Sequence, residues 1–112
     1  MITPAVRIDA EGLATRLVKD VHAELSTALK KAHLWDRLDY FEIGTAMQKR
    51  QNSPFPRFEW LSCAPVTRGG QHYVYIGTVF NGRYNLIFVG KTSDGFERAC
   101  EVANLCACEL GA

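Results

Sequence analysis

The chain has 112 residues, of which 47% are hydrophobic and 22% charged, so it has the size and composition of one ordinary globular domain over 1–112. Its 13 Lys and Arg residues against 12 Asp and Glu leave a net charge of +1, which excludes a strong overall field toward nucleic acid or an anionic membrane. No basic stretch followed by an apolar run opens the sequence, so we expect no signal peptide and a cytoplasmic location.

Residues 10–35 are expected to form a long amphipathic helix. Asp9 is a suitable N-cap, and Glu11 lies in the first turn, where the helix dipole favours a carboxylate. Apolar side chains recur at helical spacing along one stripe. The stripe consists of Leu13, Ala14, Leu17, Val18, Val21, Leu25, Ala28, Leu29, Ala32 and Trp35.

Residues 36–56 form an uncertain connecting segment. Its first half, 36–43, fits either a short helix or a strand, because neither periodicity is clear. Residues 51–56 contain two prolines among polar neighbours and are expected to form a loop.

From residue 57 onward the hydrophobic period changes to two, which predicts strands at 57–64, 72–80 and 83–90. Asn81-Gly82 is a strong signal for a two-residue hairpin turn, since both residues tolerate positive φ. That turn predicts Phe80 opposite Arg83 and Ile76 opposite Ile87 on one face, and Tyr75 opposite Phe88 on the other. We expect the second face, which also carries Tyr73, Tyr84 and Leu86, to be the one covered by the helices.

Residues 94–110 predict a final helix, with Asp94 and Glu97 spaced as in a capping box. Its small residues Ala99, Ala103 and Ala107 allow a close approach to the sheet. The expected fold class is therefore α+β. A long N-terminal amphipathic helix, a three-stranded antiparallel β-meander and a C-terminal helix packed on the sheet follow one another.

No residue pattern indicates catalysis or metal binding. Three of the four cysteines, Cys100, Cys106 and Cys108, fall in the last helix at spacings that do not allow a bridge. We interpret them and Cys63 as small hydrophobic residues in a reducing compartment. We therefore expect neither an enzyme, nor a cofactor, nor a metal site. A small ligand or a substrate in a pocket between the first helix and the sheet remains an alternative.

The predicted sheet has apolar residues on both faces, more than helices on one side can hide. Either 36–56 covers the face that the helices leave over, or part of that face is exposed and marks a partner surface or a dimer interface. The leading hypothesis is a non-catalytic protein-binding module, in the form of a small stand-alone adaptor or inhibitor. The candidate partner-binding residues are Phe55, Arg57, Arg68, Phe80, Arg83 and Leu105.

The order α-β-β-β-α resembles the double-stranded-RNA-binding domain over roughly the last half of the chain. The similar residues are the turn at 69–72, the alternating strand before Asn81-Gly82, and Ala99, Val102, Ala103 and Ala107. The resemblance implies a nucleic-acid alternative, whose candidate contacts are Lys49, Arg50, Arg57, Arg68 and Lys91. That family begins its last helix with a lysine cluster on the phosphates, whereas residues 94–98 here are mainly acidic, so the resemblance implies the topology more than the RNA affinity.

Overall fold

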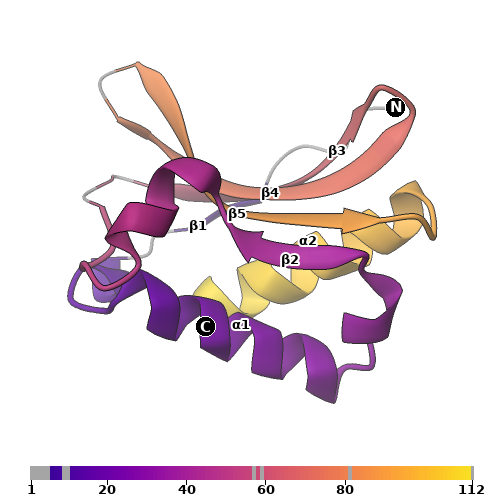
Figure 1. Cartoon of the computed structure of the whole chain (residues 1–112), viewed down its shortest axis with the longest axis horizontal. Helices are drawn as coiled ribbons and strands as arrows, with labels where there is room; N and C mark the ends of the chain where they lie inside the picture. Colours follow the sequence, from indigo (N-terminus) through magenta and orange to yellow (C-terminus); the bar gives the residue numbers. More distant parts are fainter. Residues whose placement is uncertain (1–5, 9–10, 57, 59, 81, 112) are drawn as a thin grey trace.

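A curved antiparallel sheet with two helices on one of its faces forms the fold (Figure 1). The computed structural model describes residues 6–8, 11–56, 58, 60–80 and 82–111. The α+β class, the N-terminal helix and the C-terminal helix on the sheet are confirmed. In chain order the elements are β1 (Val6–Ile8), η1 (Glu11–Leu13), α1 (Val18–Lys31), η2 (Trp35–Arg37), β2 (Tyr40–Ile43), η3 (Thr45–Arg50), β3 (Leu61–Arg68), β4 (Gln71–Phe80), β5 (Arg83–Thr92) and α2 (Phe96–Gly111).

The sheet has five strands in the order β1-β3-β4-β5-β2, so the expected three-stranded meander is only its centre. The uncertain segment supplies β2, which pairs with β5, and the N-terminal residues supply β1, which pairs with β3. With three and four residues, these edge strands are too short for their period to be recognised in the sequence. Strand β3 also lies later in the chain than the predicted 57–64.

Helix α1 begins eight residues later than the predicted 10, because the chain before it binds the loop over 51–55. The amide of Val18 donates to the carbonyl of Ser53 at 3.1 Å, and that of Lys19 to Gln51 at 2.9 Å. These two amides have no partner inside the helix. Loop carbonyls therefore replace the side-chain cap expected from Asp9, which lies outside the described residues, as does the neighbouring residue 10.

Helix α1 ends in a Schellman motif rather than continuing to Trp35. The amide of His33 donates to Lys30 O at 3.1 Å, and that of Leu34 to Leu29 O at 2.9 Å. His33 takes the left-handed position of the motif, with a φ of 59°. The buried side chains of Leu34 and Leu29 belong to the same core, which is the hydrophobic contact that accompanies this motif.

The β4–β5 hairpin has the predicted register near its turn and a different one farther away. Phe80 lies opposite Arg83 as expected, but Ile76 pairs with Phe88 and Tyr75 with Val89. A β-bulge at Ile87 inserts one extra residue between these two regions. Two-residue alternation cannot predict such an insertion, so every pair beyond it is displaced by one.

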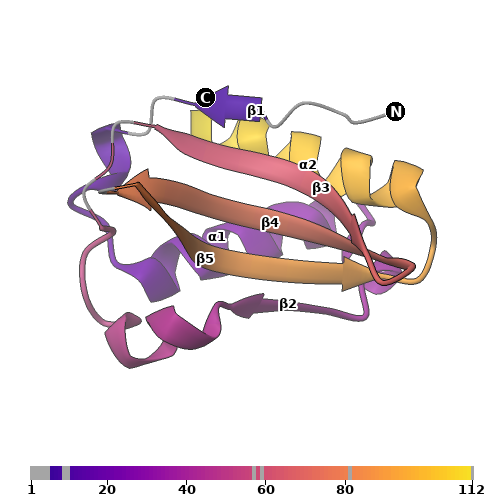
Figure 2. The ribbon, with the colours of Figure 1, turned by 90° about the horizontal axis from the view of Figure 1, so that it is seen from above.

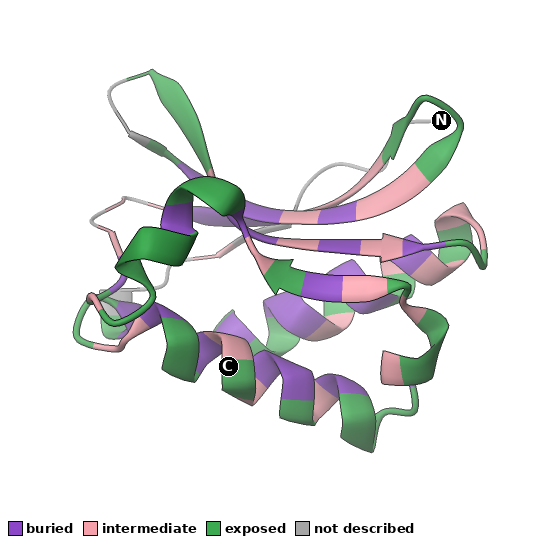
Figure 3. Cartoon of the chain, viewed as in Figure 1, coloured by how far each residue is buried: buried purple, intermediate pink, exposed green. Residues whose placement is uncertain are grey.

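The core lies between the helices and the sheet face that they cover (Figure 3). From β4 this face contributes Val74, Ile76 and Thr78, all fully buried, so the helices cover the face opposite to the one expected. Cys63 and Cys106 are buried there as well, and none of the four cysteines forms a disulfide. Helix α2 packs on both the sheet and α1. More of its surface is therefore buried than the predicted stripe, including Val102 and, in part, Leu105.

The sheet edges are short and partly blocked. Strand β1 covers only Leu61–Cys63 of β3, and Pro65 lies in the part of β3 beyond it. A proline has no amide hydrogen to offer an incoming strand, which is why proline in sheets is found at edges.

Candidate functional site

The sheet face away from the helices is the candidate functional site. Both described helices lie on one side of the sheet, and the β3–β4 and β4–β5 hairpins rise on the other side at its two ends (Figure 1). Figure 2 looks onto that side, with the strands in front of the helices. We name the residues that strand pairing places on it the open face. They are Tyr40, Glu42, Ser62, Ala64, Val66, Arg68, Gln71, Tyr73, Tyr75, Gly77, Val79, Tyr84, Leu86, Val89 and Lys91.

All four tyrosines of the chain lie on the open face. The ring centroids of Tyr73 and Tyr75 are 5.9 Å apart at an angle of 45°. Tyr84 is 47% exposed and Val79, its cross-strand neighbour, is 39% exposed. The sequence assigned three of these tyrosines to the core, although a tyrosine suits a surface where one end of the ring meets water.

The Tyr84 ring fills the space above Gly77. A Cβ atom on Gly77 would lie 2.6 Å from Cζ and Oη of Tyr84, so only glycine permits this contact. The Tyr84 side chain is hydrogen-bonded to that of Ser62, which is itself buried. Burial of the hydroxyl end raises the pKa of Tyr84 above its ordinary value of 10.0, and the Ser62 hydrogen bond opposes this shift only in part. The outer side of the ring stays available to a partner.

The cation Lys91 on the open face is paired with a carboxylate of the same chain. Lys91 Nζ lies 2.8 Å from Asp39 Oδ2, and Ser93 Oγ donates to the same oxygen at 2.7 Å. These hydrogen bonds lower the pKa of Asp39, and the Asp39 hydrogen bond raises the pKa of Lys91. Lys91 therefore has an acidic partner within the chain and offers less attraction to phosphates than a lone cation.

Charge is unevenly distributed between the sheet and the last helix. Residues 60–93 contain Arg68, Arg83 and Lys91 but no Asp or Glu. Residues 94–112 contain four acidic residues and only Arg98 as a base. The meander is thus basic and the helix behind it acidic, although the whole chain is nearly neutral.

The structure moves several expected binding residues away from the surface. Phe55, expected as an anchor on a loop, is only 3% exposed and packs against Phe58 and Phe88 with centroids 5.9 Å from each. Leu105, expected on an outward face of the last helix, is half-buried against the core. Arg57 and the side chain of Phe80 lie outside the described residues.

The expected basic residues do not converge. Lys49 and Arg50 are exposed on η3. Arg68 of β3 and Arg83 of β5 are also exposed. They lie opposite the two ends of β4, Arg68 across from Gln71 and Arg83 across from Phe80. Gln71 and Phe80 are nine positions apart along β4, which corresponds to roughly 30 Å along the strand. The nucleic-acid candidates therefore form no continuous basic track among the described residues.

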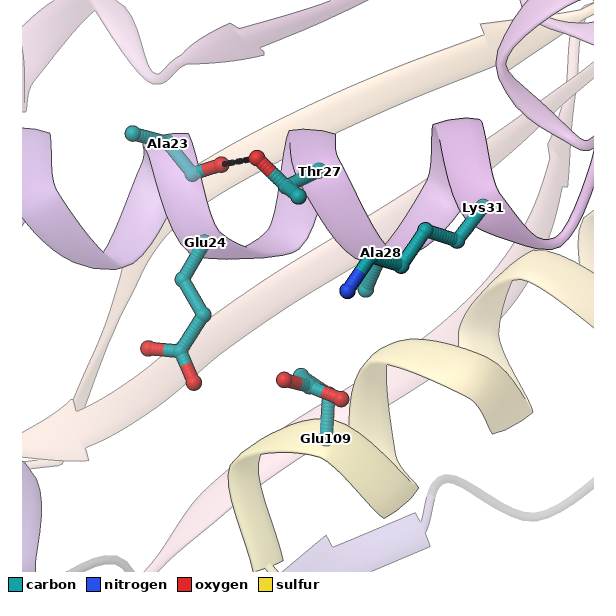
Figure 4. Close-up of a pocket in the computed structure, with 6 residues that line it drawn as sticks. All are labelled: Ala23, Glu24, Thr27, Ala28, Lys31 and Glu109. Carbon is teal, nitrogen blue, oxygen red and sulfur yellow. Dashed lines mark hydrogen bonds between the residues drawn. The ribbon is translucent and has the colours of Figure 1, made fainter.

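A groove lies on the helix side of the molecule. It measures about 390 Å³ and lies between α1 and α2 (Figure 4). Its lining comprises Ala23, Glu24, Thr27, Ala28, Lys31 and Glu109. Glu24 pairs with Arg16, and the Thr27 hydroxyl donates to Ala23 O at 3.0 Å, so both are committed to structural contacts.

His22 has a structural role in its contacts with Phe41. His22 lies with Nε2 3.0 Å from the carbonyl oxygen of Phe41, and its ring stacks on Phe41 at 5.3 Å. In the part of the chain that the structure describes, no three His, Cys, Asp or Glu side chains are grouped as metal ligands. Among the same residues, no helix has the length and apolar character needed to cross a membrane.

Comparisons with known proteins found no relative. No protein-family model matches the chain, no curated protein matches it, and no solved structure matches it. The similarity to the double-stranded-RNA-binding domain remains an expectation from the sequence. The functional argument rests on the open face itself.

Proposed function

We propose that this chain is a non-catalytic protein-binding module, and that its partner docks on the open face. The observation that carries the proposal is a sheet surface on which neither α1 nor α2 lies, with four tyrosines and the half-buried aliphatic side chains Val66, Leu86 and Val89 between them. Contiguous apolar surface on a small protein marks an interaction site. Tyrosine is enriched at such interfaces, because its ring buries apolar area while its hydroxyl remains hydrogen-bonded.

The charges favour a protein over a nucleic acid as the partner. A nucleic acid draws its affinity from several cations along the phosphates. The open face offers Arg68 and Lys91, of which Lys91 is paired with Asp39, and Glu42 is exposed on the same face. A protein partner needs few charges when apolar burial supplies the binding energy.

A cytoplasmic location is part of the proposal. The four cysteines form no disulfide, and Cys108 is exposed. Such thiols persist in a reducing compartment.

A pull-down with matched variants tests the proposal. Val79→Glu places a charge on an exposed position of the open face, whereas Asn104→Glu places the same charge on an exposed position of α2. The tagged wild type and both variants are incubated with nuclease-treated native lysate, and bound proteins are identified by mass spectrometry. Circular dichroism establishes that both variants are folded.

We expect one protein to bind the wild type and Asn104→Glu in stoichiometric amounts and to be lost with Val79→Glu. A bound protein that Val79→Glu retains would place the interface elsewhere. Recovery of nucleic acid in untreated lysate, lost at moderate salt, would contradict the proposal and support the nucleic-acid alternative.

A further inference from the structure

We infer that the protein which docks on the open face is a second copy of this chain, packed face to face with the first about a two-fold axis. The inference rests on the proposed function, because it names the partner that occupies the open face. It follows from the charges that this face leaves unpaired and from the positions that the strand register gives them.

The open face carries one unpaired charge of each sign. Its charged residues are Glu42, Arg68 and Lys91, and Lys91 is already paired with Asp39. Glu42 and Arg68 are both exposed, and no described residue of opposite charge forms an ion pair with either of them. A surface with one cation and one carboxylate left over is complementary to itself, since each group can meet the other on a second copy.

The strand register places these two charges on a diagonal of the sheet. Glu42 lies opposite Val89, and Val89 lies opposite Tyr75 of β4. Arg68 lies opposite Gln71 of the same strand. The two charges are therefore four positions apart along the strands and three strands apart across the sheet. These separations correspond to roughly 13 Å and roughly 14 Å, so the line between the charges runs at about 45° to the strands.

A single two-fold axis brings both pairs of opposite charges together. Two faces that pack in this way share an axis that lies in the plane between them. When the axis is midway between the two charges and perpendicular to the line that joins them, Arg68 of each copy lies over Glu42 of the other. This axis passes over the cross-strand pair of Tyr73 and Lys91. The strands of the two copies then cross at about 90°, which is one of the two common angles of sheet packing.

The shape of the sheet suits this crossed arrangement. The β3–β4 and β4–β5 hairpins rise on the open side at the two ends of the sheet (Figure 1). Two copies with their strands side by side would therefore meet at the hairpins before their central strands touched. In the crossed arrangement, the hairpins of each copy lie beside the edges of the other sheet. Val79 and Tyr84, which are exposed in the single chain, then flank the second copy.

A charge-exchange experiment tests the inference on the purified protein. Arg68→Glu places two carboxylates at each of the two contacts between the copies, and Glu42→Arg places two cations there. In an equimolar mixture of these variants, both contacts of the mixed dimer again join a carboxylate to a cation. The double variant restores both contacts within one kind of chain. Sedimentation equilibrium measures the dissociation constant of each sample, and circular dichroism establishes that each variant is folded.

We expect the wild type to form a weak dimer with a Kd on the order of 10 to 100 µM, because the crossed faces overlap over a small area. Each single variant should raise the Kd about tenfold. The mixture and the double variant should both return it to within about threefold of the wild type. The controls Lys19→Glu and Glu109→Arg reverse exposed charges on α1 and α2. Alone or mixed, they should change the Kd by less than about twofold.

A wild type that is still monomeric at about 1 mM would overturn the inference. The same holds for single variants that weaken the dimer without recovery in the mixture, and for a dimer that every variant retains. The pull-down with Val79→Glu judges the proposed function separately. A monomeric wild type that still binds a lysate protein, and loses it with Val79→Glu, would leave the proposed function standing with a different occupant.

Discussion

A single histidine holds the end of α1 in a conformation that glycine adopts more easily. His33 has a φ of 59° at the left-handed position of the Schellman motif. A side chain with a Cβ atom costs roughly 1 kcal/mol there relative to glycine. The cost falls on a residue whose side chain is exposed.

We therefore expect His33→Gly to raise the free energy of unfolding by about 0.5 to 1 kcal/mol. Urea denaturation of the wild type, His33→Gly and His33→Ala measures the effect. The alanine variant keeps the Cβ atom and should show no such gain. A glycine variant less stable than the wild type would contradict the assignment of strain to His33.

The ionisation of Tyr84 makes the stability of the protein depend on pH in the alkaline range. Burial raises the pKa of Tyr84 above the 10.0 of an unfolded chain, so the folded state favours the neutral phenol. The corresponding stability is complete below pH 10 and is lost as the pH rises through the higher pKa of the folded state. Phenylalanine keeps the ring but does not titrate.

We expect the free energy of unfolding to fall less steeply above about pH 10 in Tyr84→Phe than in the wild type. Denaturation curves at a series of pH values from about 8 to 11 give the two slopes. Ultraviolet titration of the tyrosinate band reports the same ionisation directly in the folded protein. Identical slopes would show that the Tyr84 hydroxyl is not buried against Gly77.

At the scale of single residues, burial could be predicted only where apolar residues fall on one face of an element and polar residues on the other. The sequence placed the aliphatic residues of α1 correctly, including Val21 and Leu25. It failed for Phe55, because a loop aromatic gives no indication of which way its ring turns. It also failed for the tyrosines, since an alternating strand that is apolar on both faces does not show which face the helices cover.

The beginning of α1 depends on a loop more than thirty residues later. Val18 and Lys19 donate their amides to Ser53 and Gln51. Amides in the first turn of a helix usually exchange rapidly with solvent because they have no intrahelical partner. Here the loop supplies the partner, so the loop and the first turn should open together.

We expect the amides of Val18 and Lys19 to exchange as slowly as those in the middle of α1, measured by hydrogen exchange with NMR detection. The amide of Lys49 on the exposed η3 serves as a fast-exchanging reference. Exchange of Val18 and Lys19 at intrinsic rates would show that the loop does not cap the helix.

Elements with strong local signals were predicted, and those set by distant contacts were not. The hairpin near Arg83 and the last helix follow from turn chemistry and periodicity, and both are present. The late start of α1 follows from the loop at 51–53, and the edge strand β2 follows from pairing with β5. Both are tertiary effects that local propensity cannot reveal.

The contact between the sheet and α2 buries two thiols, and their reactivity can show whether these two layers stay together. Burial raises the pKa of Cys63 to about 12, and burial together with the nearby Cys63 raises the pKa of Cys106. A thiol reacts as its thiolate, so neither should react while the sheet and α2 remain together. Cys108 is exposed on the same helix.

We expect an aromatic disulfide reagent at about pH 8 to modify Cys108 rapidly and Cys63 and Cys106 only when the protein unfolds. Mass spectrometry of tryptic peptides identifies the modified positions, and the protein in denaturant gives the rate for accessible thiols. Modification of Cys63 as fast as Cys108 would mean that the sheet and α2 separate readily in the native state.

At the scale of the whole molecule, the α+β class and the placement of α2 on the sheet followed from the order of strong elements. The number of strands did not, because β1 and β2 carry three and four residues and acquire their pairing only from the completed sheet. The charge separation between 60–93 and 94–112 is visible in the sequence. Only the structure shows that the basic segment 60–93 forms the centre of the sheet and that the acidic segment forms a helix packed against it.

The short strand β1 also influences how the protein behaves when it is damaged. Its pairing with Leu61–Cys63 covers a part of β3 that contains no proline. Proteolysis that removed β1 would expose a row of backbone donors and acceptors beside three buried residues. Such an edge can pair with a strand of another molecule, so we expect the protein without β1 to aggregate more readily than the intact chain while its open face stays the same.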